Sequence, residues 1–232
     1  MKKGIKSYLA FTSGAYRLIL FVLVPIAVVG LNVVLAVYTR QTHLPGADEL
    51  DGILGAVNVM MFVAASLMMF AEVMMDNMAF GGIAVKRSQS LDYMKASPKG
   101  RQLMRRALRT DLVRCLFENA IVITLSRVAW WIIGEAAGAW RIQDIARILA
   151  LVACQYFVTV TVLLITRHYD IWGVNMLVVY IGFFVLLALV ALSWMNSFAM
   201  LAVMAVLSAA VSVFSQWKIM RRVEASFYDR KN

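Results

Sequence analysis

The sequence predicts an all-α integral membrane protein: six transmembrane helices, an N-terminal interfacial helix and a cytoplasmic helix-turn-helix between spans two and three. Three observations point to this class. Apolar residues make up 62% of the 232 residues and charged residues 16%, against about 45–50% and about 25% in soluble domains. The mean hydropathy is +0.77, and the basic residues gather in a few segments. No stretch has the composition of a separate soluble domain, so we expect one transmembrane domain over residues 1–232.

The spans follow from length and apolar content. A helix needs about 20 apolar residues to cross about 30 Å of hydrocarbon. Six windows meet this requirement, and each is continuously apolar instead of alternating with period two, which favours helices over barrel strands. The windows are approximately 18–38, 53–76, 113–133, 147–166, 173–194 and 198–217.

The orientation follows from lysine and arginine in the segments between the windows. With the N-terminus inside, 19 of the 23 basic residues lie on the cytoplasmic side, three lie outside, and Arg127 lies within span three. Both termini are therefore predicted to be cytoplasmic, in a bacterial plasma membrane, with the lipid bilayer as a partner. The net charge of +10 is explained by topology, so we expect no nucleic-acid partner.

The two cytoplasmic ends have different expected structures. Residues 1–17 are predicted to form an interfacial helix with an apolar face; the alternative is a frayed basic terminus. Residues 218–232 are expected to be a basic cytoplasmic tail. The face of the interfacial helix comprises Ile5, Tyr8, Leu9, Thr12 and Tyr16.

Segment 81–112 is too long for a simple connection between two spans. Ser97 followed by Pro98 is a helix-start signal, and residues 90–96 form a second, short helical candidate. The helix after Pro98 is amphipathic. Its basic face is either a solvated or lipid-headgroup-binding face or part of a docking surface for a soluble subunit. The apolar stripe comprises Leu103, Met104, Ala107, Leu108 and Leu112, and the basic face Arg101, Arg105, Arg106 and Arg109.

This order of elements, together with the stretch from Leu91 to Leu103, resembles the permease subunit of a type-2 ATP-binding-cassette exporter in its bacterial half-size form. The resemblance implies that segment 81–112 seats in a groove of an ATPase subunit. The short connection 195–197 departs from members that carry re-entrant outer helices, which argues against a subtype that exports polysaccharides or large lipids. The residues expected to couple to the ATPase are Leu91, Asp92, Tyr93, Ser97, Pro98, Arg101, Leu103 and Arg105.

The resemblance also implies partners. None of the 13 glycines is followed by lysine, so the chain has no phosphate-binding loop of the Gly-Lys-Ser/Thr type. We expect no enzyme activity and no cofactor on this chain, ATP and Mg on a separate ATPase subunit, and a second permease subunit in a homodimer or heterodimer.

His43 and His168 fall on opposite sides of the membrane, so no metal site is expected. The alternatives are the substrate-binding membrane subunit of an energy-coupling-factor importer and a non-transporting scaffold.

Glu72 and Asp76 are four residues apart, hence on one helical face, near the cytoplasmic end of span two. Charges inside a membrane are costly and indicate function by default. The structural interpretation pairs both carboxylates with Lys86, Arg87 or another basic residue of the coupling segment. The alternative is a proton or cation relay.

Span three carries two further candidate charges, Glu118 and Arg127. Arg114 lies one turn before Glu118 and is expected to pair with it, while Arg127 is expected to extend outward; substrate contact is the alternative for both. Span two is rich in methionine, which suits a path for hydrophobic peptides or drugs but is also ordinary in membrane helices. Its methionines are Met60, Met61, Met68, Met69, Met74, Met75 and Met78.

Overall fold

The computed structural model describes residues 2–42, 47–80, 98–133, 142–169 and 172–228, and within these ranges the chain is almost entirely helical, without strands. Chain order gives two short N-terminal helices, a π-helical turn and six long helices. They are α1 (Lys2–Phe11), α2 (Gly14–Leu18), η1 (Ile19–Leu23), α3 (Val24–Thr42), α4 (Ala47–Phe80), α6 (Gly100–Ile133), α7 (Ile142–Thr166), α8 (Trp172–Met195) and α9 (Ser197–Tyr228).

Five stretches of these helices are long and apolar enough to cross a membrane, which agrees with a multi-pass membrane protein. They overlap five of the six predicted windows. The remaining window lies in α6, which has 34 residues but carries Arg114, Glu118 and Arg127. The sixth span therefore stays a prediction. The five stretches are Gly14–Gln41, Val59–Asp76, Ile145–Thr166, Gly173–Leu192 and Ser197–Arg221.

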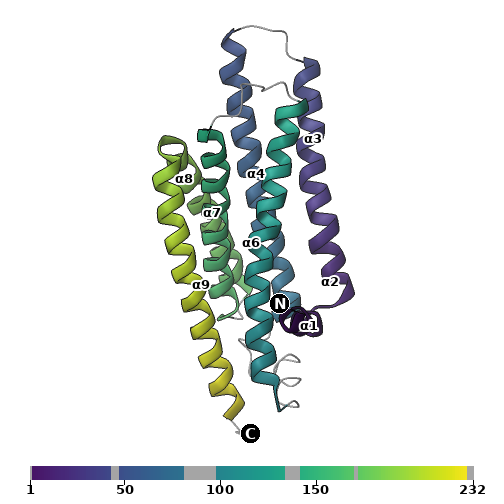
Figure 1. Cartoon of the computed structure of the whole chain (residues 1–232), viewed down its shortest axis with the longest axis vertical. Helices are drawn as coiled ribbons and strands as arrows, with labels where there is room; N and C mark the ends of the chain where they lie inside the picture. The colour runs from purple at the N-terminus through teal and green to yellow at the C-terminus, as the bar shows by residue number, and fades with distance from the viewer. Residues whose placement is uncertain (1, 43–46, 81–97, 134–141, 170–171, 229–232) are drawn as a thin grey trace.

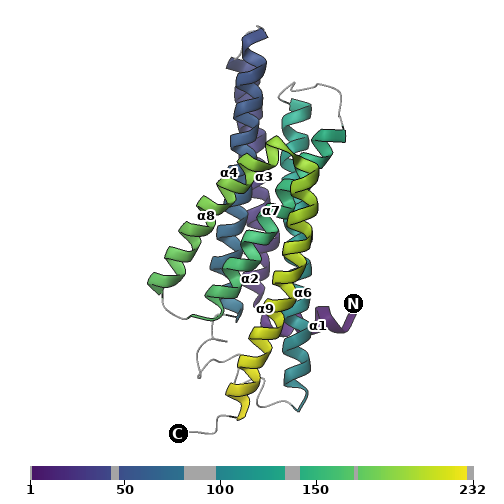
Figure 2. The same cartoon turned by 90° about the vertical axis from the view of Figure 1, so that its left-hand side faces the viewer.

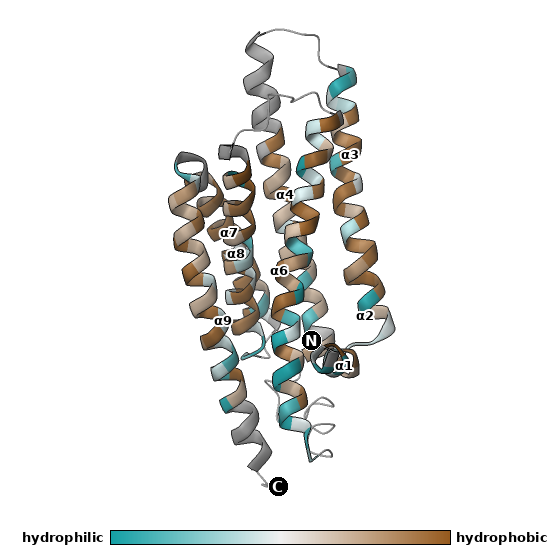
Figure 3. Cartoon of the chain, viewed as in Figure 1, coloured by the Kyte–Doolittle hydropathy of each residue, from teal (hydrophilic) through white to brown (hydrophobic). Residues whose placement is uncertain are grey.

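The long helices form an elongated bundle, and α1 and the C-terminal end of α9 lie toward the same end of it (Figures 1 and 2). Helix α6 packs against α3, α4 and α7, while α7 packs most extensively against α9. Helix α1 lies crosswise near the end that holds the termini and packs on α6. Hydrophilic residues gather in this lower part of α6 (Figure 3), so the polar end of the bundle is the one next to α1.

The N-terminal helix is shorter than predicted. It ends at Phe11, and Ser13 caps α2 by accepting a hydrogen bond from the backbone N–H of Tyr16 at 3.1 Å. Because the chain turns at this cap, residues 1–17 do not share one continuous helical face. Tyr8 and Tyr16 are buried, whereas Ile5 and Leu9 are exposed, so the predicted apolar face is divided between the interior of the bundle and its surface.

The predicted start of the coupling helix is also displaced. Helix α6 begins at Gly100, where the carbonyl of Lys99 accepts the first hydrogen bond from the N–H of Leu103 at 3.0 Å, and Pro98 lies in the preceding turn. Ser97 and the short helix predicted over residues 90–96 lie outside the described residues. At the other end, the predicted tail begins as a helix, because α9 continues to Tyr228.

The core is shared by the long helices. Its largest cluster draws on α3, α4, α6, α7, α8 and α9, and within it Trp130 of α6 donates a hydrogen bond from Nε1 to Asn32 Oδ1 at 2.9 Å. Four methionines of span two fill buried clusters of this chain, so their packing matches ordinary core residues. They are Met61, Met68, Met69 and Met75.

Candidate functional site

A network of buried charges joins α4, α6 and the end of α7. Glu72 and Asp76 lie one turn apart on α4, and α6 contributes a stripe at i, i+3 and i+7. Arg167 follows the last residue of α7. The six members are Glu72, Asp76, Asp111, Arg114, Glu118 and Arg167.

Arg114 uses all five of its N–H donors within the network. Its two terminal nitrogens bind Glu72 in the bidentate fork arrangement, at 2.8 and 2.6 Å. Nη1 also donates to Glu118 Oε2 at 2.6 Å, while Nε and Nη2 donate to Asp111 Oδ1 at 3.2 and 2.9 Å. This is the full donor capacity of a guanidinium group, so Arg114 fixes three carboxylates from two helices around one plane.

Arg167 holds the second half of the network. It donates from Nε to Asp76 Oδ2 at 2.8 Å and from Nη2 to both Asp76 Oδ1 and Asp111 Oδ2, the latter at 2.5 Å. Asp111 thus bridges the two arginines, with Oδ1 on Arg114 and Oδ2 on Arg167. The result is a continuous chain of ion pairs from α4 through α6 to the end of α7.

Aromatic rings close the network from the side of α1 and η1. The Arg114 guanidinium lies 5.9 Å from the ring centre of Tyr8 and 5.6 Å from that of Phe21, and Arg167 lies 5.1 Å from that of Phe80. Burial raises the pKa of the Tyr8 hydroxyl, so it stays protonated and donates to Tyr16 Oη at 3.2 Å. The rings pack on the arginines, and Tyr8 connects α1 to the charged cluster.

The charges of the network do not balance. Four carboxylates share two guanidinium groups, so full ionisation would leave two buried negative charges in excess, which is costly in a low dielectric. Both oxygens of Glu72 and of Asp76 accept hydrogen bonds from arginine. Glu118 Oε1 is buried and has no hydrogen-bond partner in the described part of the chain. A proton that relieved the excess would therefore fit best at Glu118.

The structure brings together three of the four predicted intramembrane charges: Glu72, Asp76 and Glu118. The expected pair between Arg114 and Glu118 is present. The partners of the other two are Arg114 and Arg167, while Lys86 and Arg87 lie outside the described residues. These contacts favour the structural interpretation of Glu72 and Asp76, and they leave Glu118 as the better candidate for any proton relay.

The fourth predicted charge, Arg127, lies apart from Glu118 along the same helix. It is nine residues further on, about 13 Å at 1.5 Å per residue, and its side chain is half-buried.

The predicted coupling residues fall in two groups. Leu91, Asp92, Tyr93 and Ser97 lie outside the described residues. Of the others, Pro98, Arg101 and Arg105 are exposed and Leu103 is half-buried.

Most of the apolar stripe of this segment packs inside the chain instead of facing outward. Met104, Ala107, Leu108 and Leu112 are buried within the chain, the first three in a cluster that contains Tyr8 of α1 and Met220 of α9. An amphipathic pattern in the sequence indicates that one face of the helix is covered, but it does not identify the element that covers it. The arginine face remains exposed.

Sequence reasoning missed Arg167 and Asp111 as members of the network. Both lie between predicted apolar windows, where charged residues are expected. Asp111 could have been found, because it lies one turn before Arg114 and two turns before Glu118 on one helical face. Arg167 had no such local signal, since its partner Asp76 is 91 residues away.

No protein-family model matches the chain, and neither a curated protein nor a solved structure is significantly similar to it. Function therefore has to follow from the residues themselves. Within the described ranges, no three His, Cys, Asp or Glu side chains are grouped so as to hold a metal ion. In the charged cluster the space between the carboxylates is occupied by guanidinium groups.

Proposed function

We propose that the chain is the transmembrane subunit of an ATP-driven exporter, with six spans and both termini in the cytoplasm of a bacterial cell. Its path for substrate is shared with a second permease subunit, and ATP is hydrolysed with Mg on separate ATPase subunits. Counting α6 as a span gives an even number of crossings, which agrees with α1 and the C-terminal end of α9 lying toward one end of the bundle.

The observation that carries this proposal is the continuity of α6. One unbroken helix runs from Gly100 to Ile133, so the exposed arginine face at its start is rigidly joined to the predicted third span. The ion pairs of Arg114 and Arg167 tie this helix to α4 and to the end of α7, and α1 packs on it. A displacement of the cytoplasmic segment by ATPase closure would therefore move several spans together.

The packing of the methionines on α4 also limits where the proposed path for cargo can run. Among the methionines of α4 whose side chains the structure describes, Met60 and Met74 are half-buried and four others face the core, so a hydrophobic peptide or drug moving along span two would contact Met60 and Met74. In this proposal the path runs along the outer side of α4, where a second permease subunit would complete it.

The proposal predicts that the coupling segment holds the ATPase. We expect the tagged wild-type chain, solubilised in mild detergent, to co-purify with an ATP-binding subunit. Leu91→Ala or Tyr93→Ala should release it, since truncating a buried anchor typically costs about 2 kcal/mol or more, about thirtyfold in affinity. Arg105→Ala should weaken binding less and change mainly its salt dependence.

Size-exclusion profiles identical to wild type would show that the two variants still fold. If the wild type brings down no ATP-binding subunit, or if both variants retain it fully, the exporter proposal fails in favour of an importer subunit or a scaffold.

A further inference from the structure

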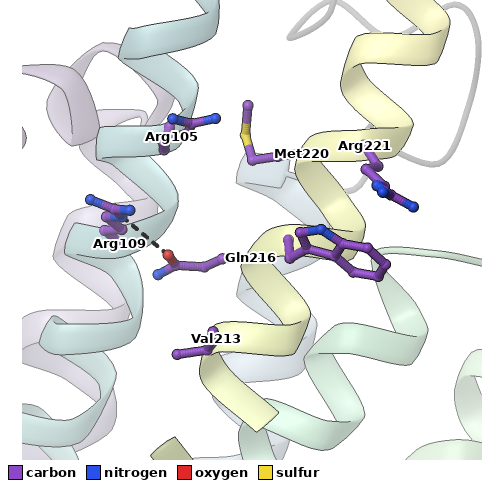
Figure 4. Close-up of a pocket in the computed structure, with 7 residues that line it drawn as sticks. Arg105, Arg109, Val213, Gln216, Met220 and Arg221 are labelled. Atoms are coloured by element: carbon purple, nitrogen blue, oxygen red, sulfur yellow. Dashed lines mark hydrogen bonds between the residues drawn. The ribbon is translucent and has the colours of Figure 1, made fainter. Parts of the chain in front are cut away.

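A cationic pocket of about 380 Å³ lies between the polar ends of α6 and α9. Figure 4 shows Arg105 and Arg109 on α6 facing α9, from which Gln216 reaches back toward them. Arg109 donates from Nε to Gln216 Oε1 at 3.1 Å, which fixes one guanidinium in the wall. Among the residues whose side chains the structure describes, the charged ones that line this pocket are all arginines: Arg105, Arg109 and Arg221.

The pocket continues into an apolar groove on α9. Arg221 lies over the indole ring of Trp217, 4.1 Å from its centre. Trp217 and Val213 line both the pocket and the groove, whose other lining residues are Ala209, Ala210 and Phe214. The groove has a volume of about 660 Å³. The two small alanines leave a depression between the larger side chains.

Along α9, the basic residues and the apolar groove lie at different depths in the membrane. The apolar stretch Ser197–Arg221 is long enough to span a membrane and ends at Arg221. Ala209 lies 12 residues before it, about 18 Å deeper at 1.5 Å per residue. Three arginines therefore lie at the depth of the lipid headgroups, and the groove runs from there toward the bilayer interior.

We propose that this pocket and groove bind one anionic phospholipid, with its phosphate among Arg105, Arg109 and Arg221 and an acyl chain along Ala209, Ala210 and Phe214. Guanidinium groups bind phosphate through paired N–H donors. Basic pockets between transmembrane helices bind anionic headgroups at the cytoplasmic surface, and tryptophan favours the interface between headgroups and hydrocarbon. The combination fits a diacyl lipid better than an acidic peptide, which would leave the apolar groove unfilled.

Quenching by brominated lipid tests this site directly. The full chain in neutral detergent is titrated with phosphatidylglycerol or phosphatidylcholine brominated in one acyl chain, and tryptophan fluorescence is recorded. Because the chain has six tryptophans, Trp217→Phe identifies the part of the signal that comes from the groove. We expect phosphatidylglycerol to quench Trp217 at concentrations at least about tenfold lower than phosphatidylcholine does.

Two kinds of variant distinguish binding in the pocket from attraction of the lipid to the basic surface as a whole. Arg105→Gln combined with Arg221→Gln should raise the apparent Kd for phosphatidylglycerol about 25-fold, at about fivefold for each arginine. Lys99→Gln combined with Arg106→Gln removes the same charge from the same end of α6 outside the pocket, and should change Kd less than about threefold. Ala210→Phe fills the groove without changing charge and should weaken binding about tenfold.

Three results would overturn the proposal. The first is equal loss of binding in the two charge-matched pairs, which would indicate a diffuse basic surface. The second is displacement of the lipid by millimolar inorganic phosphate, which would indicate a simple anion site. The third is a dimer that Ala210→Phe splits while lipid binding persists, which would assign the groove to a second copy of the chain.

Discussion

Replacing Arg167 with methionine is expected to abolish the folded bundle at physiological temperature. The side chain is buried, and its loss leaves Asp76 and one oxygen of Asp111 without their cation. Removing one partner of a buried ion pair typically costs about 3–5 kcal/mol, a large part of the stability of an ordinary domain. Thermal unfolding in detergent, followed by fluorescence-detected size exclusion, would measure the loss.

Arg106→Met is the matched control for this change, because Arg106 is an exposed arginine near the start of α6. It should shift the unfolding temperature little. Equal stability of the Arg167 variant and wild type would show that the network does not hold the helices together.

Replacing Arg114 with methionine should be about as damaging, at about 3–5 kcal/mol, since Glu72, Asp111 and Glu118 all lose a donor at once. Arg114→Lys separates charge from geometry. A lysine ammonium keeps the positive charge but offers three donors instead of five and cannot form the planar fork. We expect it to recover only part of the lost stability.

The same unfolding assay, run on wild type, Arg114→Lys and Arg114→Met, checks this order. A lysine variant as stable as wild type would mean that charge alone is sufficient. The bidentate hydrogen bonds between Arg114 and Glu72 would then add nothing to stability beyond the attraction of the two charges.

The membrane-spanning helices could be predicted from the sequence because the bilayer demands a simple property, about 20 continuous apolar residues. The five apolar stretches found in the structure overlap the predicted windows for this reason. The predicted helix ends were less accurate. The helix-start signal at Ser97 and Pro98 precedes the observed start of α6 at Gly100, because the ends of helices fray and are defined only to within one or two residues.

The network was only partly predictable, because it combines local and distant contacts. The pair of Arg114 and Glu118 lies four residues apart on one helix and follows from helical spacing. Glu72 and Arg114 are 42 residues apart, and Asp76 and Arg167 are 91 apart, so their pairing depends on how the helices pack. The apolar stripe at Met104 and Leu108 shows the same limit, since its partners belong to α1 and α9.

The central claim is that paired buried charges hold α4, α6 and the end of α7 together, and a double-mutant cycle between Arg167 and Asp76 measures it most directly. The cycle compares the unfolding free energies of wild type, Arg167→Met, Asp76→Asn and the double variant. The charge excess predicts that Asp76→Asn costs much less than Arg167→Met, and that the double variant is more stable than Arg167→Met alone, with a coupling energy of about 2 kcal/mol or more. Additive effects, with the double variant less stable than either single variant, would contradict it.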